Sequence, residues 1–436
     1  MVKSKFTPVI LITIFVVASF ALSTELLAHA APTANDWPMF HHDLTHTGYS
    51  TSTASATSAT LLWNYTTNSV VGASPTIVNG YVYIGSDGGI AYCLNALDGS
   101  KVWNYTIQAS TRGSHGAGGP AISSSMAVAD GYVYFGCYDR NVYCLNAFTG
   151  DKIWNYTTGN TVESCPSVTG GYVYVGSWDG NMYCLDATTG EKIWNYTTGS
   201  LVESSPAVVD GKVYFGSVDK NVYCLDASNG DKIWSYPTGN LIQSSPAVVG
   251  DYLYIGSEDN NLYCLNASSG DKIWSYPTQG WVDSSPAVAN GYVYVGSWVV
   301  DANQNDVASD AASDVYCLDA STGAKIWNYT THGGVNSSPA VTGGFVYVGG
   351  WDNNVYCLNA STGAEIWTYT TQGHINSSPA VAGGIVYVGS WDHNVYAFGA
   401  PQPSQAIPTE IIYPAVAIIA VLVVIAMVLI FRKRKP

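Results

Sequence analysis

The sequence predicts an all-β protein, an eight-bladed β-propeller of four-stranded antiparallel blades closed by an N-terminal strand, plus one C-terminal transmembrane helix. Three observations lead to this prediction. A motif of about forty residues recurs along most of the chain, a period typical of repeat architectures. Every copy holds four short apolar runs separated by turn residues. A proline and a tryptophan mark each copy, and their relative phase indicates how the ends of the ring meet.

The copy at residues 204–243 has the clearest strand pattern. Its apolar runs, at 205–209, 212–217, 222–225 and 232–236, are rich in Val, Ile, Tyr and Trp, which suit a pleated surface. An Asp-Gly pair between the first two runs is a hairpin turn signal. Because every run is too short for a helix, each copy indicates one four-stranded propeller blade.

The two markers predict a closed ring. The residue that opens the first strand of each blade occupies Pro75, Met126, Pro166, Pro206, Pro246, Pro286, Pro339 and Pro379. The tryptophan of the fourth strand occupies Trp63, Trp103, Trp154, Trp194, Trp234, Trp274, Trp327 and Trp367. The first tryptophan precedes the first proline, whereas the last copy ends at Phe398, before a tryptophan strand of its own. We therefore expect residues 61–67 to complete the last blade, so that the propeller spans 61–399 without an open sheet edge.

Two stretches, CLDATTGEKIW at Cys184–Trp194 and CLDASTGAKIW at Cys317–Trp327, carry a family resemblance. They resemble the tryptophan-docking repeat of the pyrroloquinoline-quinone-like (PQQ-like) propellers, with Cys where that family usually has Ala. The resemblance recurs eight times along the predicted propeller. It implies eight blades in which each tryptophan packs against the glycine-containing turn of a neighbouring blade.

Both ends of the chain carry membrane signals. Residues 1–30 have a basic start, an apolar stretch and a small-residue cleavage site, as in a secretory signal peptide. A proline-rich spacer at 400–410 leads to an uncharged run at 411–431 that is long enough to cross a bilayer. The basic tail at 432–436 indicates a cytoplasmic end. We expect a single-pass cell-membrane protein with its propeller outside the cell.

The lead-in and Ser/Thr linker at 31–60 contain a histidine cluster. His41, His42 and His46 surround Asp43, but their spacing matches no metal-ligand signature. We expect a locally hydrogen-bonded cluster rather than a metal site.

An insertion in the sixth blade is a candidate calcium site. Oxygen-bearing side chains crowd into it at Asp301, Asn303, Asn305, Asp306 and Asp310. The spacing opens like a calcium loop, but the sixth position is Asp306 rather than Gly and the twelfth is Ala312 rather than Glu. Calcium binding and a simple polar hairpin tip are therefore both open.

The cysteines fall into two groups. Seven share one position in the third strand: Cys93, Cys144, Cys184, Cys224, Cys264, Cys317 and Cys357. We expect these to be small buried hydrophobes, because equivalent atoms of neighbouring blades are too far apart for a disulfide. Cys137 and Cys165 replace serines in adjacent blades, and an inter-blade disulfide between them is one hypothesis.

Net charge and glycosylation sequons limit the classes of partner that the sequence favours. Asp and Glu outnumber Lys and Arg by 31 to 16, which disfavours nucleic acid and anionic polymers. Glycosylation sequons begin at Asn64, Asn104, Asn155, Asn195, Asn266, Asn328, Asn336, Asn359 and Asn376. Because the repeat copies the motif, these are not independent signals, but they allow glycosylation of an exported protein.

The candidate binding site is a ring at one mouth of the central channel. The residues three places before each strand-opening position are Gly72, Ser123, Glu163, Glu203, Gln243, Asp283, Asn336 and Asn376. Six consecutive blades offer a carboxylate or carboxamide there, which suits a cation, a sugar or a peptide; a solvated polar rim is the alternative. Tryptophans in the turn between the second and third strands are expected elsewhere on each blade, where stacking on a ligand is one reading and covering of blade edges is the favoured one: Trp178, Trp298, Trp351 and Trp391.

Two classes of function follow. The first is a non-catalytic cell-surface scaffold that presents the propeller to envelope proteins or glycans. The family resemblance implies the second, a quinoprotein dehydrogenase that holds PQQ and calcium in the channel. A tricarboxylated quinone needs cationic partners, yet Arg112 and Arg140 are the only arginines of the expected exported part. The sequence also contains no catalytic motif that we can name, so we expect a binding protein rather than an enzyme, with PQQ disfavoured as a cofactor.

Overall fold

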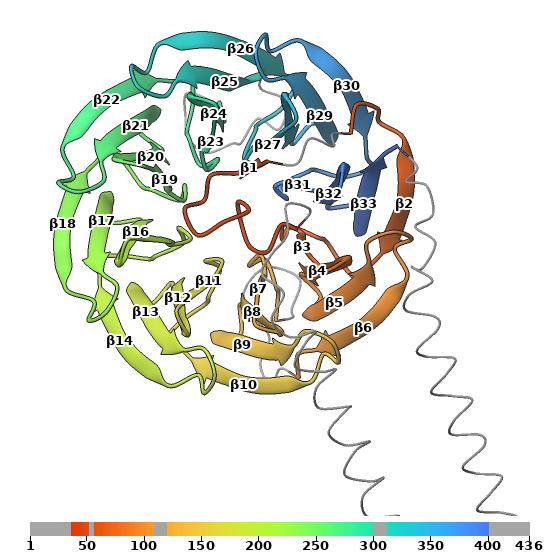
Figure 1. Cartoon of the computed structure of the whole chain (residues 1–436), viewed down its shortest axis with the longest axis vertical. Coiled ribbons are helices and arrows are strands. Elements are labelled where there is room, and N and C mark those ends of the chain that lie inside the picture. Colours follow the sequence, from red (N-terminus) through yellow and green to blue (C-terminus); the bar gives the residue numbers. More distant parts are fainter. Residues whose placement is uncertain (1–35, 52–55, 109–119, 300–311, 401–436) are drawn as a thin grey trace, which may run out of the picture. The chain divides into compact units, whose positions relative to one another are not determined.

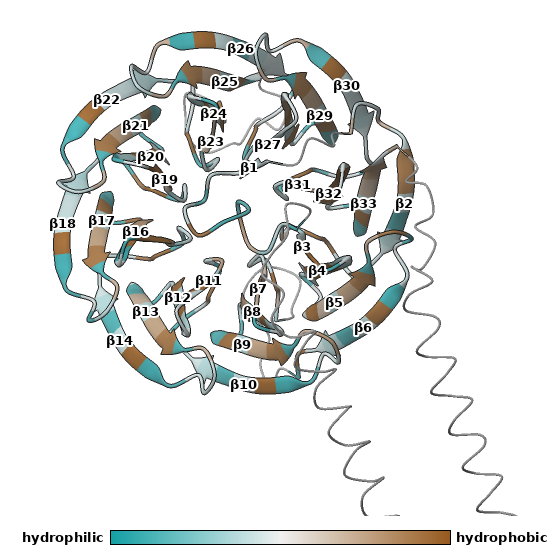
Figure 2. Cartoon of the chain, in the orientation of Figure 1, coloured by the Kyte–Doolittle hydropathy of each residue, from teal (hydrophilic) through white to brown (hydrophobic). Residues whose placement is uncertain are grey.

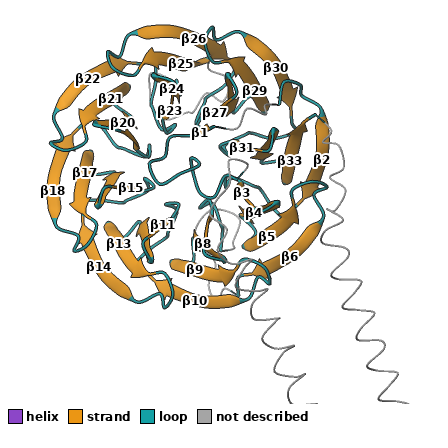
Figure 3. Ribbon diagram, viewed as in Figure 1, coloured by secondary structure: helices purple, strands orange, loops and turns teal. Residues whose placement is uncertain are grey.

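The computed structural model describes residues 36–51, 56–108, 120–299 and 312–400. In this part of the chain eight sheets form a ring, which confirms the predicted all-β eight-bladed propeller (Figure 1). Figure 3 shows strands joined by loops, and no helix within the described ranges is long and apolar enough to cross a membrane. The predicted signal peptide, the candidate calcium residues at 301–310 and the predicted transmembrane helix lie outside the described residues.

Each blade has four antiparallel strands that follow one another outward from the axis. The innermost strands are β3 (Thr76–Val78), β7 (Ala127–Ala129), β11 (Ser167–Thr169), β15 (Ala207–Val209), β19 (Ala247–Val249), β23 (Ala287–Ala289), β27 (Ala340–Thr342) and β31 (Ala380–Ala382). The second strands are β4 (Tyr81–Ser86), β8 (Tyr132–Gly136), β12 (Tyr172–Gly176), β16 (Lys212–Gly216), β20 (Tyr252–Ser257), β24 (Tyr292–Gly296), β28 (Phe345–Gly349) and β32 (Ile385–Gly389). The third strands are β5 (Ile90–Asn95), β9 (Asn141–Asn146), β13 (Asn181–Asp186), β17 (Asn221–Asp226), β21 (Asn261–Asn266), β25 (Ser313–Asp319), β29 (Asn354–Asn359) and β33 (Asn394–Gly399). The outermost strands are β6 (Lys101–Thr106), β10 (Lys152–Thr157), β14 (Lys192–Thr197), β18 (Lys232–Pro237), β22 (Lys272–Pro277), β26 (Lys325–Thr331), β30 (Glu365–Thr370) and β2 (Leu61–Thr66). Blades are numbered 1 to 8 from β3 onward, and β1 (Tyr49–Ser50) adds a parallel strand to blade 7.

A tight turn and a β-bulge shape each blade, as blade 4 illustrates. Asp210 and Gly211 join β15 to β16 with φ values of 50° and 70°, and a type I′ hairpin turn requires positive φ at both positions. In β18, Ile233 forms a bulge because it has no partner on β17. The bulge leaves Ile233 45% exposed and turns Trp234 inward, to 8% exposed.

The docking tryptophans join neighbouring blades, as predicted. Trp234 of blade 4 donates from Nε1 to the carbonyl of Ala267 in blade 5 at 3.1 Å. The indole covers Gly270, where a Cβ would lie 2.7 Å from the ring. The same arrangement recurs at Trp63, Trp103, Trp154, Trp194, Trp274 and Trp327. Figure 2 shows the apolar third strands, which contribute to apolar clusters between adjacent blades.

The chain before the first blade completes the last one, also as predicted. β2 pairs with β33, and Trp63 donates to the carbonyl of Ala96 in blade 1 at 3.0 Å. Trp367 of blade 7 donates instead to the carbonyl of Ala56 at 2.8 Å. Ala56 belongs to the predicted linker and is fully buried. This part of the linker therefore supplies the docking carbonyl that blade 8 lacks.

A circular chain of hydrogen bonds joins the innermost strands where they begin. The backbone N–H of Ser205 donates to Ser245 Oγ at 2.9 Å, and the same bond recurs from each blade to the next. The acceptors, in order around the ring, are Ser245, Ser285, Ser338, Ser378, Ser74, Ser125, Cys165 and Ser205. Each blade gives one donor and one acceptor, so the chain of bonds closes on itself, with one thiol among seven hydroxyls.

All nine cysteines are buried free thiols. The seven aligned cysteines are small buried residues, as expected, and burial raises the pKa of the Cys224 thiol to about 12. The hypothesised disulfide between Cys137 and Cys165 is not formed. Cys137 Sγ accepts a bond from the N–H of Asp139 in its own turn, at 3.4 Å. Cys165 Sγ belongs to the circular hydrogen-bond chain and accepts from Ser125, so each sulfur has a separate role.

Candidate functional site

The two ends of the propeller axis differ. The end at which the innermost strands begin, together with the turns between second and third strands, is called the ring face. The segment 36–51 crosses the axis at the other end, in red-orange in Figure 1. There Val208 donates to the carbonyl of Leu44 at 2.8 Å. Glu203 of the ring lies five residues before Val208, about 16 Å away along an extended chain, so the segment and the ring face lie at opposite ends.

Backbone hydrogen bonds hold the segment 36–51 against six blades. The donors, one on each innermost strand, are Ile77, Val128, Val208, Val248, Val288 and Val341. The acceptors are carbonyls spread along the segment from Trp37 to Gly48. The segment therefore covers this end of the axis.

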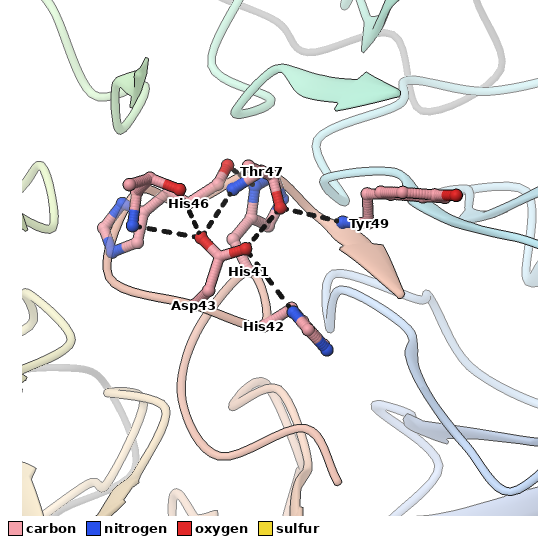
Figure 4. A network of polar contacts seen from close by, with 7 residues as sticks. His41, His42, Asp43, His46, Thr47 and Tyr49 are labelled. Atoms are coloured by element: carbon pink, nitrogen blue, oxygen red, sulfur yellow. Dashed lines mark hydrogen bonds and ion pairs between the residues drawn. The ribbon is translucent and has the colours of Figure 1, made fainter. Parts of the chain in front are cut away.

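Asp43 is the centre of the polar network within the segment (Figure 4). Its carboxylate accepts N–H and Oγ1 bonds from both Thr45 and Thr47, and it lies 3.5 Å from Nδ1 of His42. Burial alone would raise the pKa of Asp43, but the hydrogen bonds outweigh burial and hold the pKa well below its ordinary value. The cluster is locally hydrogen-bonded, as the sequence predicts.

His41 and His46 lie in the interior of this network. Burial lowers the pKa of His41 to about 4 and that of His46 to about 3, so both rings are neutral at pH 7. Each keeps one buried ring nitrogen without a partner. Across the described residues, however, no group of three or more His, Cys, Asp or Glu side chains is arranged to hold a metal ion.

The ring face carries a cluster of carboxylates from four consecutive blades. Three are predicted ring residues, and the fourth, Glu258, comes from the turn between β20 and β21. Glu163, Glu203, Glu258 and Asp283 are called the acidic arc. Burial first, then the charges of Glu163 and Glu258, raise the pKa of Glu203 to about 8. Burial, then Glu258 and Glu203, raise the pKa of Asp283 to about 8.

The other predicted ring residues do not belong to this carboxylate cluster. Gln243 is exposed. Asn336 and Asn376 are half-buried, and Oδ1 of Asn376 is buried without a hydrogen-bond partner. The acidic half of the predicted ring is therefore brought together, and the amide half lies beside a different set of neighbours.

Those neighbours are the second-turn tryptophans, and the expectation that they lie elsewhere is wrong. The N–H of Trp351 donates to the carbonyl of Gly334, two residues before Asn336, at 2.9 Å. A Cβ on Gly72, itself a ring position, would lie 3.9 Å from Nε1 of Trp391. The turns between second and third strands are bonded to the loops that lead into the innermost strands, and this places both sets of side chains on one face.

A continuous aromatic surface results. Trp281, Trp298, Trp351, His374 and Trp391 are called the aromatic arc. Ring centroids are 6.5 Å apart for Trp281 and Trp298, 4.8 Å for Trp298 and Trp351, and 5.3 Å for Trp351 and Trp391. His374 stacks on Trp351 at 5.1 Å, and its Nδ1 is bonded to the carbonyl of Trp351. The arc meets the acidic arc in blade 6, because Trp281 and Asp283 share one loop.

Several polar atoms of the two arcs have no partner. Oδ1 of Asp283 is a buried acceptor without a donor, and the indole N–H groups of Trp298 and Trp351 are buried donors without an acceptor. Glu258 is only 7% exposed, and burial raises the pKa of its carboxyl. Unsatisfied buried groups are costly, which makes this face the candidate binding surface.

No described basic side chain forms an ion pair with Glu203, Glu258 or Asp283. In the described part of the chain the one ion pair is that of His42 with Asp43. Arg140 and Lys220 lie in second turns, but both are exposed. The ring face therefore combines a cluster of carboxyl groups of raised pKa with aromatic surface.

Sequence reasoning missed Glu258, Trp281 and His374. Glu258 occupies the repeat position that holds Trp178, Trp298, Trp351 and Trp391 in other blades. Alignment of the copies could have found it, had the second turns been placed on the ring face. Trp281 and His374 occupy equivalent places in loops between blades, two residues before the ring positions Asp283 and Asn376.

The sequons sort by location. The asparagines of the outermost strands, Asn64, Asn104, Asn155, Asn195 and Asn328, are exposed. Asn266 and Asn359 are half-buried and accept backbone bonds in the turns that follow them. Asn336 and Asn376 belong to the ring face, where a glycan would compete with the arcs for space.

Comparison with protein families gives one model that matches most of the chain. Its description is "Outer membrane protein assembly factor BamB", and the matched residues are 19–157, 115–240, 222–310 and 311–402.

Individual relatives include dehydrogenases as well as the assembly factor BamB. The quinohemoprotein alcohol dehydrogenase of Comamonas testosteroni is 28% identical over 137 residues, which are 30% of this chain and 19% of that protein. The crystal structure of BamB from Moraxella catarrhalis matches with a TM-score of 0.65 at 20% identity, over 80% of this chain and 99% of that one. A europium-containing methanol dehydrogenase matches with a TM-score of 0.72 at 15% identity, over 84% and 98%. The chain spans about a fifth or less of the curated relatives it matches, and the structural likeness concerns the fold.

Proposed function

The chain belongs to the family described as outer membrane protein assembly factor BamB, and from that premise we propose that it is a non-catalytic propeller that binds a partner through its ring face. The partner is an envelope protein or a glycan. One observation carries the proposal: the ring face holds the carboxyl groups of Glu203, Glu258 and Asp283, which no described basic side chain balances, next to aromatic surface suited to a contact.

The same observation opposes the alternative function, a quinoprotein dehydrogenase. A quinone with three carboxylates needs cations around it, and the acidic arc offers carboxyl groups instead. At the opposite end of the axis, the segment 36–51 is bonded to six blades and occupies the space. The described residues therefore do not fit the quinone, and we derive no redox step through it.

Residues outside the described ranges extend this proposal. The signal-like segment 1–30 and the uncharged segment 411–431 support export and anchoring of the propeller at the cell surface. Exposed sequon asparagines on the outermost strands, such as Asn155 and Asn195, are compatible with glycosylation there.

The enzymatic alternative is tested with the purified full chain. PQQ is titrated calorimetrically with and without Ca²⁺, and alcohol-dependent reduction of an artificial electron acceptor is followed in parallel. We expect neither saturable quinone binding nor acceptor reduction. Saturable quinone binding with alcohol-dependent reduction would instead establish a dehydrogenase. Heat with Ca²⁺ alone, lost in Asp301→Ala, would assign a calcium site to the sixth-blade hairpin without changing the proposed function.

The binding role is tested by cross-linking in the envelope with a matched control. Trp351→Ala/Trp391→Ala removes aromatic surface from the ring face. Ile193→Ala/Ile233→Ala removes apolar surface from the outermost strands, where these side chains are 47% and 45% exposed. We expect a specific partner to be cross-linked by wild type and by the control, and to fall at least tenfold in the ring-face variant. Equal cross-linking by all three proteins would place the contact elsewhere.

A further inference from the structure

The acidic and aromatic arcs form one continuous surface with three features that a ligand must match. The acidic arc supplies the carboxyl groups of Glu203, Glu258 and Asp283, which have no basic partner in the described residues and which a cation would help to ionise. The aromatic arc supplies ring faces, with Trp391 37% exposed. Between them lie buried polar atoms of both types, acceptors on Asp283 and Asn376 and donors on Trp298 and Trp351.

These three features distinguish among classes of ligand. A metal ion would satisfy charge alone, and no three acidic, histidine or cysteine side chains of the described residues are arranged around one point. A glycan has donors and acceptors but no cationic group for the acidic arc. A polyamine supplies cationic donors but no acceptor for the indole N–H groups of Trp298 and Trp351.

A basic peptide segment matches all three features of the surface. Its Lys or Arg side chains supply the cations, and their alkyl stems and guanidinium planes pack on aromatic faces. Its backbone carbonyls accept from indole N–H groups, and its backbone amides donate to Asn376. Glu203, Glu258 and Asp283 come from three consecutive blades, which suits several spaced cations rather than a single one.

We propose that the ring face binds an extended Lys- or Arg-bearing segment of a partner protein, with the cationic groups on the acidic arc and the adjacent residues on the aromatic arc. This inference rests on the proposed binding function and names the chemistry of its partner.

The test is calorimetric titration of the full chain with a defined probe, the acetylated and amidated pentapeptide Arg-Gly-Lys-Gly-Arg. A neutral analogue carries citrulline for Arg and acetyl-lysine for Lys. Spermidine is titrated separately as a free polyamine. We expect saturable binding of the cationic peptide, at least tenfold weaker binding of the neutral analogue, and at least tenfold weaker binding of spermidine.

Two charge-matched variants locate the site. Glu203→Gln/Asp283→Asn removes two carboxylates from the acidic arc. Glu191→Gln/Asp231→Asn removes two exposed carboxylates from connections between third and fourth strands, on the opposite face. We expect peptide affinity to fall at least tenfold in the first variant and to stay within twofold of wild type in the second. Tryptophan fluorescence provides a second readout, for the aromatic arc. We expect the peptide to change the fluorescence of wild type and this change to be lost in the Trp351→Leu variant.

Four results would overturn the inference: no peptide binding, equal binding of the neutral analogue, spermidine binding as tight as the peptide, or equal loss in both charge variants. Absence of peptide binding together with cross-linking that still depends on Trp351 and Trp391 would reject the basic partner while the proposed binding function stands. Absence of both would reject the two together.

Discussion

At the scale of single residues, the circular hydrogen-bond chain contains a direct comparison of a thiol with a hydroxyl. The N–H of Ser125 donates to Cys165 Sγ at 3.2 Å, whereas the equivalent bonds to serine are 2.9 to 3.0 Å. Because oxygen is the better acceptor, we expect Cys165→Ser to raise the free energy of unfolding by about 0.5 kcal/mol. Urea unfolding measures the change. A lower stability would mean that the thiol fits this site better than a hydroxyl does.

Removal of a hydroxyl acceptor from the circular chain should change the free energy of unfolding by more than Cys165→Ser does. Ser205→Ala removes the acceptor for the buried N–H of Cys165, and we expect a loss of about 1–3 kcal/mol in the free energy of unfolding. Ser235→Ala on the exposed side of β18 is the control and should change stability by less than about 0.5 kcal/mol. If both variants unfold alike, the circular chain contributes nothing measurable.

Titration of the acidic arc is a second prediction at this scale. Between the ordinary carboxyl pKa and the raised value of about 8 for Glu203 and Asp283, the folded protein holds protons that the unfolded chain releases. Unfolding then releases protons, so stability falls as pH rises through this window, by at most about 1.4 kcal/mol per pH unit for each group. Above about pH 8 the fall should end.

Urea unfolding from about pH 5 to about pH 9 measures this slope. We expect Glu203→Gln and Asp283→Asn each to flatten it, because an amide does not titrate. The exposed Glu191→Gln is the control and should leave the slope unchanged. Histidines that titrate in the same range contribute equally to the slopes of wild type and variants, so the difference between two slopes excludes their contribution. A wild-type slope that persists in the double variant would assign the proton release to other groups.

At the scale of elements, two glycines separate backbone strain from packing. Gly211 and Gly270 both have positive φ, 70° and 78°. A Cβ on Gly211 meets nothing within 4 Å, whereas one on Gly270 lies 2.7 Å from Trp234. We expect Gly211→Ala to cost about 1–2 kcal/mol from strain and Gly270→Ala to cost about 1–3 kcal/mol more from the clash. Equal losses by urea unfolding would show that the docked indole shifts freely.

The segment across the axis depends on Asp43. Asp43→Ala removes the acceptor for bonds from Thr45 and Thr47, whereas Asp43→Asn keeps one oxygen. We expect faster hydrogen exchange at the amides of Val208, Val248 and Val288, which donate to this segment, with the larger effect in the alanine variant. Unchanged exchange at these amides in Asp43→Ala would mean that the segment is held by its backbone bonds alone.

These elements differ in how far the sequence predicts them. The strands, turns and docking tryptophans follow from a pattern repeated eight times, so each copy supports the others. Ala56 and the segment around Asp43 occur once, and composition gives no signal that they would be buried. At the ring face, the position of Glu203 follows from repeat counting. Its proximity to Glu258 depends on how loops of adjacent blades meet, which the spacing within one copy does not specify.

At the scale of the whole molecule, ring closure is a single event that joins residues far apart in sequence. The phase of the prolines and tryptophans predicts it, and β2 pairs with β33 accordingly. Internal blades are held to their neighbours by a continuous chain as well as by packing. Blade 8 alone is completed by a strand from the other end of the propeller, so its outer strand depends on non-covalent contacts for its attachment.

Trp63 and Trp234 test this difference because their surroundings match. Each is 8% exposed, and each donates to an alanine carbonyl of the next blade, at 3.0 and 3.1 Å. Replacement by Ala should lower the free energy of unfolding by about 3–5 kcal/mol in either case. In Trp63→Ala, however, β2 can separate from β33 and leave an open strand edge, which promotes association between chains. Light scattering should therefore detect concentration-dependent oligomers in Trp63→Ala and monodisperse protein in Trp234→Ala, whose strand stays tethered on both sides. Identical scattering from the two variants would mean that the N-terminal strand closes the ring as firmly as a continuous chain does.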